Sequence, residues 1–108
     1  MRTPLDQQED EWNATLNTNL RGTWLMSKAV AKRLVAAKRG GSIINISSIA
    51  GLERSMLPGA MAYGVSKAAV IHLSKVQLPS ISHLFHDADF ALTMWVFAAG
   101  DGYGAREV

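Results

Sequence analysis

The sequence predicts an α/β fold, and three segments carry the prediction. Apolar residues recur at three- and four-residue spacing up to Lys38, as in a long amphipathic helix. Residues 42–46 are rich in β-branched side chains and follow Gly40-Gly41, which is typical of a buried strand. A second helical segment is expected over residues 61–77. The order helix, strand, helix is typical of proteins in which helices cover a mostly parallel sheet.

The first helix has a start signal, a weak point and a stop signal. Asp6 and Glu9 have the spacing of a capping box, in which the two side chains bond to backbone amides of the first turn. Residues 17–19, with Gly22 close behind, have low helix propensity, so we expect a break or kink there. Lys38 and Arg39 with the glycine pair that follows form the expected stop. The expected apolar face consists of Trp12, Leu16, Leu20, Trp24 and Leu25.

The second helix is expected to begin at Met61 and to be stopped by Pro79. Its expected core stripe is Val65, Ala69, Leu73 and Val76, with Tyr63, Lys67 and Ser74 on a neighbouring face. Between the strand and this helix, residues 51–60 form a loop punctuated by Pro58-Gly59. Leu52, Met56 and Leu57 give that loop an apolar wall.

The tail over residues 78–108 carries two motifs that we do not interpret as sites. His83 and His86 with Asp87 and Asp89 have metal-ligand types, but no distant pair completes a coordination shell, so no metal is expected. The glycine-rich segment 100–105 matches a dinucleotide fingerprint, yet only three residues follow it and a helix must follow. We expect a flexible glycine-rich terminus. The apolar segment 90–98 fits a short strand or a helix, and its pattern does not decide between them.

Tyr63 and Lys67 are the residues with the clearest chemical meaning. Four residues apart on a helix, they share one face. A free tyrosine has a pKa near ~10, and a cation about 4 Å away would favour the phenolate by up to ~4 kcal/mol, or roughly three pKa units. Ser48 follows the predicted strand at the edge where parallel sheets place ligands, and its hydroxyl suits a substrate oxygen. These groups suit proton transfer during the reduction of a carbonyl or the oxidation of an alcohol.

Three segments in order resemble the central third of the short-chain dehydrogenase/reductase family, especially its 3-oxoacyl-[acyl-carrier-protein] reductase-like branch. They are residues 19–24, residues 40–51 and residues 62–69, and the similarity spans about residues 5–76. The resemblance implies part of a Rossmann-like doubly wound parallel sheet. The family's N-terminal strand and glycine-rich cofactor loop have no counterpart before the first segment, so we expect a fragment that lacks the cofactor-binding half. We accordingly divide the chain into a family-like segment, 1–77, and a divergent tail, 78–108.

The resemblance also implies roles for individual residues. Tyr63 corresponds to the family's general acid/base, and Lys67 to its partner; both also bind the cofactor at the nicotinamide ribose. Ser48 fits the family's Ser-x-x-Gly pattern and is expected to orient the carbonyl, while the side chain of Ser47 points the other way in an extended strand. Asn19 corresponds to the family residue at a helix irregularity that links Lys67 to solvent through water. The implied cofactor is NADP or NAD.

Two functional interpretations follow, together with a third in which the chain is an unstable product without a function. In the first, the chain is part of an NAD(P)-dependent oxidoreductase that interconverts a carbonyl and a secondary alcohol, with Tyr63 as general acid/base. In the second, it is a non-catalytic truncated module that forms a homo- or hetero-oligomer with full-length homologues through its two long helices. The substrate and the preference between NADP and NAD stay open.

Composition narrows the class of partners and the compartment. The net charge is +2 and the eleven basic residues are scattered, which is unlike a nucleic-acid-binding surface. The apolar stretch from Phe90 to Ala99 is about half the length that a membrane span needs, and no signal peptide is readable. There is no cysteine, so no disulfide framework is possible. We expect a cytoplasmic protein with a small-molecule carbonyl or alcohol substrate and no nucleic-acid or membrane partner.

Overall fold

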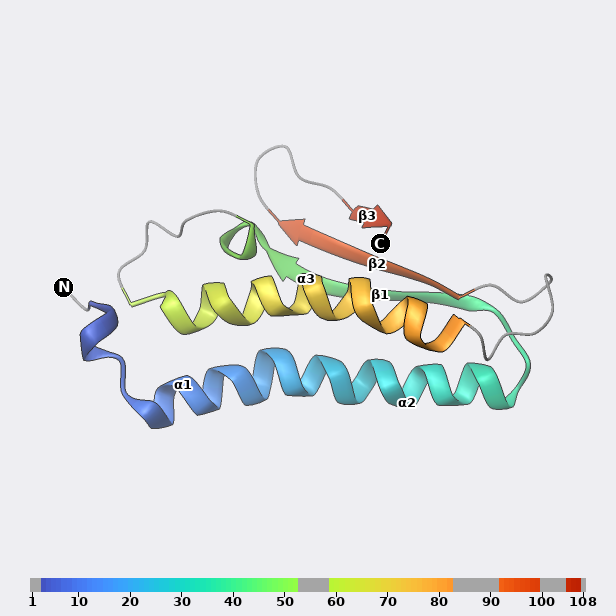
Figure 1. Cartoon of the computed structure of the whole chain (residues 1–108), viewed down its shortest axis with the longest axis horizontal. Helices are drawn as coiled ribbons and strands as arrows, with labels where there is room; N and C mark the ends of the chain where they lie inside the picture. The colour runs from blue at the N-terminus through green and yellow to red at the C-terminus, as the bar shows by residue number, and fades with distance from the viewer. Residues whose placement is uncertain (1–2, 53–58, 83–91, 100–104, 108) are drawn as a thin grey trace.

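The computed structural model describes residues 3–52, 59–82, 92–99 and 105–107 of the chain (Figure 1). The helical elements are α1 (Glu9–Leu16), α2 (Gly22–Ala36) and α3 (Met61–Ser82). The strands are β1 (Gly41–Ser48), β2 (Leu92–Ala99) and β3 (Ala105–Glu107). A π-helical segment, Asn17–Arg21, joins α1 to α2, and short 3-10 turns occupy Pro4–Asp6 and Ile49–Gly51.

The strands form one sheet in the order β1-β2-β3. β1 and β2 are parallel and paired along their whole length, from Gly41 opposite Leu92 to Ser48 opposite Ala99. α3 connects them, as a parallel pair requires, and this βαβ arrangement confirms the predicted α/β class. The apolar segment of the tail, for which both a strand and a helix were open, forms the strand β2 over Leu92–Ala99. β3 pairs antiparallel with β2, so the expectation of a flexible terminus is wrong for Ala105–Glu107, while residues 100–104 lie outside the described part.

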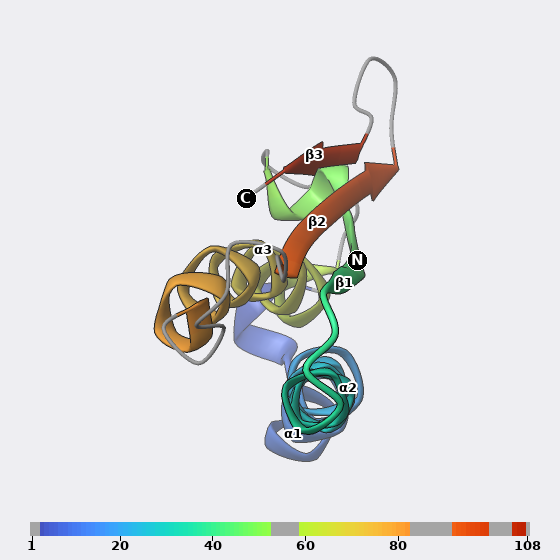
Figure 2. The same cartoon turned by 90° about the vertical axis from the view of Figure 1, so that its right-hand side faces the viewer.

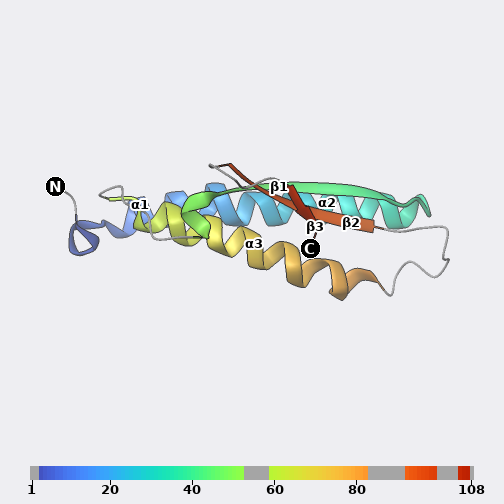
Figure 3. The ribbon, with the colours of Figure 1, turned by 90° about the horizontal axis from the view of Figure 1, so that it is seen from above.

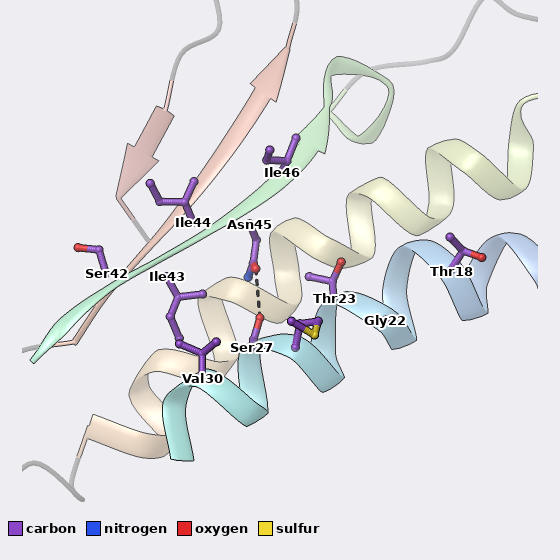
Figure 4. Close-up of a pocket in the computed structure, with 11 residues that line it drawn as sticks. Thr18, Gly22, Thr23, Ser27, Val30, Ser42, Ile43, Ile44, Asn45 and Ile46 are labelled. Atoms are coloured by element: carbon purple, nitrogen blue, oxygen red, sulfur yellow. Dashed lines mark hydrogen bonds between the residues drawn. The ribbon is translucent and has the colours of Figure 1, made fainter. Parts of the chain in front are cut away.

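The helices form a layer against the sheet. Figures 1 and 3 show α1 and α2 continuing as one long rod, with α3 running beside it. In the end-on view of Figure 2, α2 and α3 flank β1. Side chains alternate along β1: Ile43 and Asn45 are buried toward the helices, whereas Ile44 and Ile46 are 61% and 63% exposed on the other face (Figure 4). The strand predicted to be buried is therefore buried on one face, because the described helices cover that face.

The start of the first helix differs from the predicted capping box. Thr3 caps the 3-10 turn: its Oγ1 accepts from the Leu5 amide at 3.2 Å, and its own amide donates to the Asp6 carboxylate at 2.7 Å. α1 then begins at Glu9 without a side-chain cap. The proline at position 4 explains the difference, because its fixed φ favours the first position of a helical turn directly after Thr3. Asp6 is thereby the third residue of that turn and not the cap of α1.

The predicted irregularity after α1 is a π-helical turn. The amide of Gly22 donates to the carbonyl of Asn17, five residues back, which is the hydrogen bond of a π-helix. Such turns widen the helix locally and occur often at functional sites. The expectation of a break at residues 17–19 is thus confirmed as a change of helix type, and Asn19 lies within it.

The first helical rod ends at Ala36, and a lysine, not a residue of the glycine pair, takes the left-handed position after it. Lys38 has a φ of 52° and its amide donates to Val35 at 3.1 Å, while the Arg39 amide donates to Leu34 at 3.0 Å. These two bonds make a Schellman motif, whose left-handed residue is usually glycine. The predicted stop is thus confirmed at Lys38 and Arg39, whereas the glycine pair takes no part in these two bonds and Gly41 already belongs to β1.

α3 departs from the prediction in its length and in its buried face. It continues through Pro79 to Ser82, so the proline lies within the helix and does not stop it. The buried residues are not the predicted large apolar ones: Val65 and Val76 are exposed. Small side chains let the helix pack close to β1, and they occupy the inner face at every fourth position together with one valine. This inner face consists of Ala62, Ser66, Val70 and Ser74.

The same correction applies to α2, where the buried residues are Ser27 and Ala31. Trp24 and Leu25, predicted for the apolar face, are each about two-fifths exposed. Helices pack closely over a sheet where their contacting side chains are small, so bulky residues are left at the periphery. Periodicity located the helix, but it did not identify the side that faces the strand.

A chain of buried hydrogen bonds ties α2, β1 and α3 together. The Ser27 hydroxyl donates to Asn45 Oδ1 at 3.1 Å, as the dashed line in Figure 4 shows. Asn45 Nδ2 donates to Ser74 Oγ at 2.9 Å, and the Ser74 hydroxyl donates to the Val70 carbonyl at 2.9 Å. Each of the three polar side chains in this network thereby has a hydrogen-bond partner, as is usual in a protein interior. The network fixes the depth of the strand between the two helices.

Within the described ranges, none of the helices combines the length and the apolar character needed to cross a bilayer.

Candidate active site

Tyr63 and Lys67 lie on the first two turns of α3, where that helix meets the end of β1. The Tyr63 side chain is 42% exposed, so its ring is open to a ligand. Lys67 Nζ lies 5.7 Å from the centroid of that ring, within the range of a cation–π contact. The predicted pairing of the phenol and the ammonium on one helix face is thus present in the structure.

The Lys67 side chain is anchored to β1. Its Nζ donates to the Ile46 carbonyl at 3.3 Å, two residues before the end of the strand. A second contact runs the other way, because the Ser47 hydroxyl donates to the Lys67 carbonyl at 2.6 Å. Lys67 therefore bonds α3 to β1 through both its side-chain ammonium and its backbone carbonyl.

Ser48 is the last residue of β1 and the cap of the turn Ile49–Gly51. Its Oγ accepts from the Ala50 amide at 3.2 Å, so the hydroxyl proton is left to point elsewhere. Ser47 is buried on the helix side of the strand, and the less buried Ser48 follows on the opposite side of the alternation. The two adjacent serines therefore differ as predicted, with Ser48 as the accessible one.

The turn after Ser48 packs against the backbone of α3. A Cβ atom on Gly51 would lie 2.6 Å from the Lys67 carbonyl carbon and from the Ala68 amide nitrogen. A Cβ on Gly64 would lie 3.2 Å from the Ala50 carbonyl oxygen. Only glycine permits the approach at position 51, because the neighbouring atoms are backbone and cannot rotate away. This contact fixes the end of β1 relative to Tyr63 and Lys67.

Asn19 reaches the same helix from the π-helical segment. Its side-chain Nδ2 donates to Ser66 Oγ at 3.0 Å, and its backbone carbonyl accepts from the Thr23 hydroxyl at 2.7 Å. The side chain thus contacts the residue just before Lys67. The water-mediated link from Asn19 to Lys67 stays a prediction. The structure brings all four predicted residues to α3 or to the strand end beside it.

Sequence reasoning missed the contacts of two residues that build this site, Ser47 and Ser66, and it included Gly51 only as the glycine of the Ser-x-x-Gly pattern. For Ser47 the sequence predicts only that its side chain points away from that of Ser48, whereas the structure shows that its hydroxyl bonds to α3. Ser66 has no predicted role, yet its hydroxyl donates to the Tyr63 carbonyl at 2.7 Å. The available signal was spacing, since Ser66 lies three residues after Tyr63 and a serine often bonds to a carbonyl at that distance.

Two other features stand apart from this site. An open groove of about 640 Å³ lies between α2 and β1 (Figure 4), and its lining includes none of the four predicted site residues. Its walls are contributed by Thr18, Gly22, Thr23, Met26, Ser27, Val30 and residues 42–46. The candidate metal ligands His83, His86, Asp87 and Asp89 lie outside the described residues, as do Met56 and Leu57 of the apolar loop.

The arrangement can donate hydrogen bonds and a positive charge to a bound polar molecule. A phenol, an ammonium and an alcohol lie on two adjoining elements at the end of the parallel strand, where α/β sheets commonly bind ligands. The hydroxyl of Tyr63 and the ammonium of Lys67 are donors that suit the hydroxyl groups of a ribose. The exposure of Tyr63 leaves room for that contact, so the residues present fit the ribose part of a dinucleotide.

Comparison with known proteins gives a family match over most of the chain. The family profile described as short chain dehydrogenase matches residues 2–78. A (3R)-3-hydroxyacyl-CoA dehydrogenase of Homo sapiens is 44% identical over 71 residues, covering 66% of this chain and 26% of the relative. The 3-oxoacyl-[acyl-carrier-protein] reductase FabG of Chlamydia trachomatis is 45% identical over 67 residues, covering 62% of this chain and 26% of the relative. The chain thus spans about a quarter of the length of these curated relatives.

Solved structures give the same match in three dimensions. A short-chain type dehydrogenase/reductase from Mycobacterium marinum superposes with a TM-score of 0.73 at 30% identity, covering 78% of this chain and 34% of that one. A 4-hydroxyisoleucine dehydrogenase complexed with NADH and succinate has a TM-score of 0.70 at 31% identity, covering 78% of this chain and 39% of the other. ElxO with NADP bound has a TM-score of 0.66 at 32% identity, covering 78% and 33%.

Proposed function

Because this chain belongs to the short-chain dehydrogenase family, we propose that it carries the acid/base part of an NAD(P)-dependent oxidoreductase that interconverts a carbonyl and a secondary alcohol. The observation that supports the proposal most is the pairing of Tyr63 and Lys67 beside the end of β1, where Ser48 lies. Family membership supports the type of reaction, and this pairing supplies the groups that the reaction needs.

Each of three side chains has a chemical task in this proposal. In the direction of reduction, the Tyr63 hydroxyl gives its proton to the carbonyl oxygen while the carbonyl carbon accepts a hydride. The phenolate that remains is stabilised by the positive charge of Lys67, whose Nζ lies near the Tyr63 ring. A hydrogen bond to the Ile46 carbonyl of β1 holds this ammonium in place. Ser48 donates a hydrogen bond to the same carbonyl oxygen, which stabilises the charge that develops there. Oxidation of the alcohol runs through the same contacts in reverse.

The nicotinamide cofactor, when bound, supplies or accepts the hydride. Tyr63 and Lys67 would hold its ribose hydroxyls, since both side chains are donors on the open end of α3. Relatives solved with NADH and with NADP support either cofactor. The role of Asn19 in this proposal is to continue the proton path from Lys67 toward solvent.

Carbonyl reduction should depend on Tyr63. We expect the chain to oxidise NADPH or NADH in the presence of a 3-oxoacyl-CoA, the substrate class that the names of the relatives suggest. Tyr63→Phe should lower kcat by at least about 10²-fold, since a positioned acid typically contributes 10²–10⁴. Cofactor oxidation is followed by absorbance. The chain has only one other tyrosine, so Tyr103→Phe is the matched control and should keep the parent rate. Equal rates for the two variants would refute the assignment of Tyr63.

The second function that we propose as an alternative is association with full-length homologues through the two long helices. The observation that favours it is an apolar groove of about 450 Å³ between the first helical rod and α3. It is lined by Leu16, Asn17, Leu20, Arg21, Trp24 and Leu73. Trp24 is 41% exposed there, although large aromatic side chains usually stabilise a protein by being buried. A partner helix would bury it.

A further inference from the structure

Two buried serines on α3 make nearly identical hydrogen-bond clamps. Ser66 and Ser74 are both 0% exposed and lie two turns apart on the inner face of the helix. Each accepts a hydrogen bond from an asparagine Nδ2 on another element: Asn19 at 3.0 Å for Ser66, and Asn45 at 2.9 Å for Ser74. Each also donates to a carbonyl of α3 itself, three or four residues back. The two clamps differ mainly in the carbonyl to which the serine donates, which is that of Tyr63 for Ser66 and that of Val70 for Ser74.

The Ser66 clamp acts on the backbone between the two proposed reactive residues. Its hydroxyl donates to the Tyr63 carbonyl at 2.7 Å. In an α-helix that carbonyl also accepts from the amide four residues on, which is the amide of Lys67. The buried Ser66 hydroxyl therefore contacts the carbonyl oxygen of Tyr63, which is the same oxygen that accepts the helical hydrogen bond from Lys67. The other end of the clamp is Asn19 in the π-helical segment.

The Ser66 hydroxyl has little freedom to rearrange. Because its proton is used by the Tyr63 carbonyl, its oxygen must act as the acceptor for Asn19, and the amide of Asn19 must present its nitrogen. Deleting the hydroxyl leaves the Asn19 amide without this acceptor and the Tyr63 carbonyl with its helical bond alone. Losing the acceptor of the part-buried Asn19 amide is unfavourable, so the π-helical segment and the start of α3 should both adjust.

We propose that Ser66 is a positioning residue for Tyr63: it ties the π-helical Asn19 to the first turn of α3 and so sets where the Tyr63 ring stands relative to Lys67. The proposal rests on the proposed function only for the chemical importance of Tyr63. The geometric claim concerns this chain's own residues and needs no bound cofactor.

The Ser74 clamp provides a matched control within the same helix. Ser74 is as buried as Ser66, and each has two hydrogen bonds. The partners of Ser74 are Asn45 and Val70, and Asn45 is bonded in turn to Ser27, so this clamp does not include Tyr63. Ser66→Ala and Ser74→Ala should therefore lower the midpoint of thermal unfolding by similar amounts. Only Ser66→Ala should disturb Tyr63.

The test is NMR of the full chain in a Tyr103→Phe background, in which Tyr63 is the single tyrosine. Two signals are followed: the ring carbons of Tyr63, labelled with ¹³C, and the side-chain amide of Asn19, identified by its loss in Asn19→Ala. Ser66→Ala should shift both signals by more than their linewidths. Ser74→Ala should shift neither. A Tyr63 signal that is unmoved by Ser66→Ala, or moved equally by both substitutions, would overturn the proposal.

A second variant keeps the test decisive if Ser66→Ala does not fold. Asn19→Ala removes the clamp from the less buried side, and it should shift the Tyr63 ring signals in a folded chain; unshifted signals there would also overturn the proposal. The outcome is independent of the activity assay. Tyr63 signals that respond in a chain that reduces no carbonyl would refute the proposed function and leave the positioning role standing.

Discussion

At the scale of single residues, the candidate site depends on how closely its backbone segments approach. Gly51 is the clearest case, since a Cβ there would lie 2.6 Å from two backbone atoms of α3, at Lys67 and Ala68. No side-chain rotation relieves such a contact, so the turn after Ser48 must move if the glycine is replaced. The close approach of the turn Ile49–Gly51 to α3 therefore requires that position 51 has no Cβ atom.

Gly51→Ala should therefore destabilise the fold by about 1–3 kcal/mol, the usual cost of inserting an atom into a packed region. The measurement is the free energy of unfolding in urea. Gly22→Ala is the matched control, because a Cβ on Gly22 has its nearest neighbour at 3.6 Å and lies in a helix. That control should be neutral or stabilising by up to about 1 kcal/mol. A Gly51→Ala chain as stable as the parent would show that the approach is not as close as described.

The residue scale also shows how far the sequence could be interpreted. Tyr63, Lys67, Ser48 and Asn19 were predicted from spacing and resemblance, and the structure brings them to the same region of α3 and β1. The clamp at Ser66 could not be predicted, because a serine gives no sign of which distant side chain it will accept from. Its partner Asn19 is 47 positions away in the sequence, a distance that only the fold closes.

At the scale of elements, boundaries were harder to predict than element types. The helices and the first strand were located correctly, but α2 ends at Ala36, and the left-handed position after it is taken by Lys38 and not by a glycine. Glycine is the usual residue at that position, because it lacks the Cβ atom that disfavours a positive φ. The segment now seen as β2 showed no clear alternation, so its type was undecided until its pairing partner β1 was known.

The packing faces of the helices were predicted least well, and for one physical reason. Large apolar residues were expected to face the strand, yet the inner faces are formed mainly by small ones, such as Ser27 and Ala31 on α2. A helix that crosses a sheet at short range excludes bulky side chains from the contact. Those side chains then lie away from the strand, where Trp24 and Val76 remain exposed.

That exposed face leads to a prediction about association. If the alternative function holds, a mixture of the chain with a full-length short-chain dehydrogenase should give a hetero-oligomer in size-exclusion chromatography with light scattering. Trp24→Glu should abolish that species, because it places a charge in the apolar groove between the helices. Met26→Glu is the control: Met26 is more exposed but belongs to the separate groove beside β1. Two unchanged peaks with the parent chain would count against association.

At the scale of the whole molecule, the chain is a βαβ unit with a long helical rod packed beside it. The described helices cover one face of the sheet, while Ile44 and Ile46 are exposed on the other. The α/β class was predictable because helix and strand periods differ and their order was readable. The one-sided burial was not, since a run of β-branched residues looks the same whether one or both faces are covered. The division of the chain at residue 77 stays a prediction.

The central claim is that Tyr63 and Lys67 form part of a site for a nicotinamide dinucleotide. The most direct measurement is a calorimetric titration of NADH and NADPH into the chain and into Lys67→Met, with circular dichroism establishing that both are folded. We predict binding of at least one dinucleotide to the parent chain and affinity weakened about tenfold or more in Lys67→Met, the loss of one charge-assisted hydrogen-bond donor. A folded parent chain that binds neither dinucleotide, or equal affinities for the two proteins, would contradict the claim.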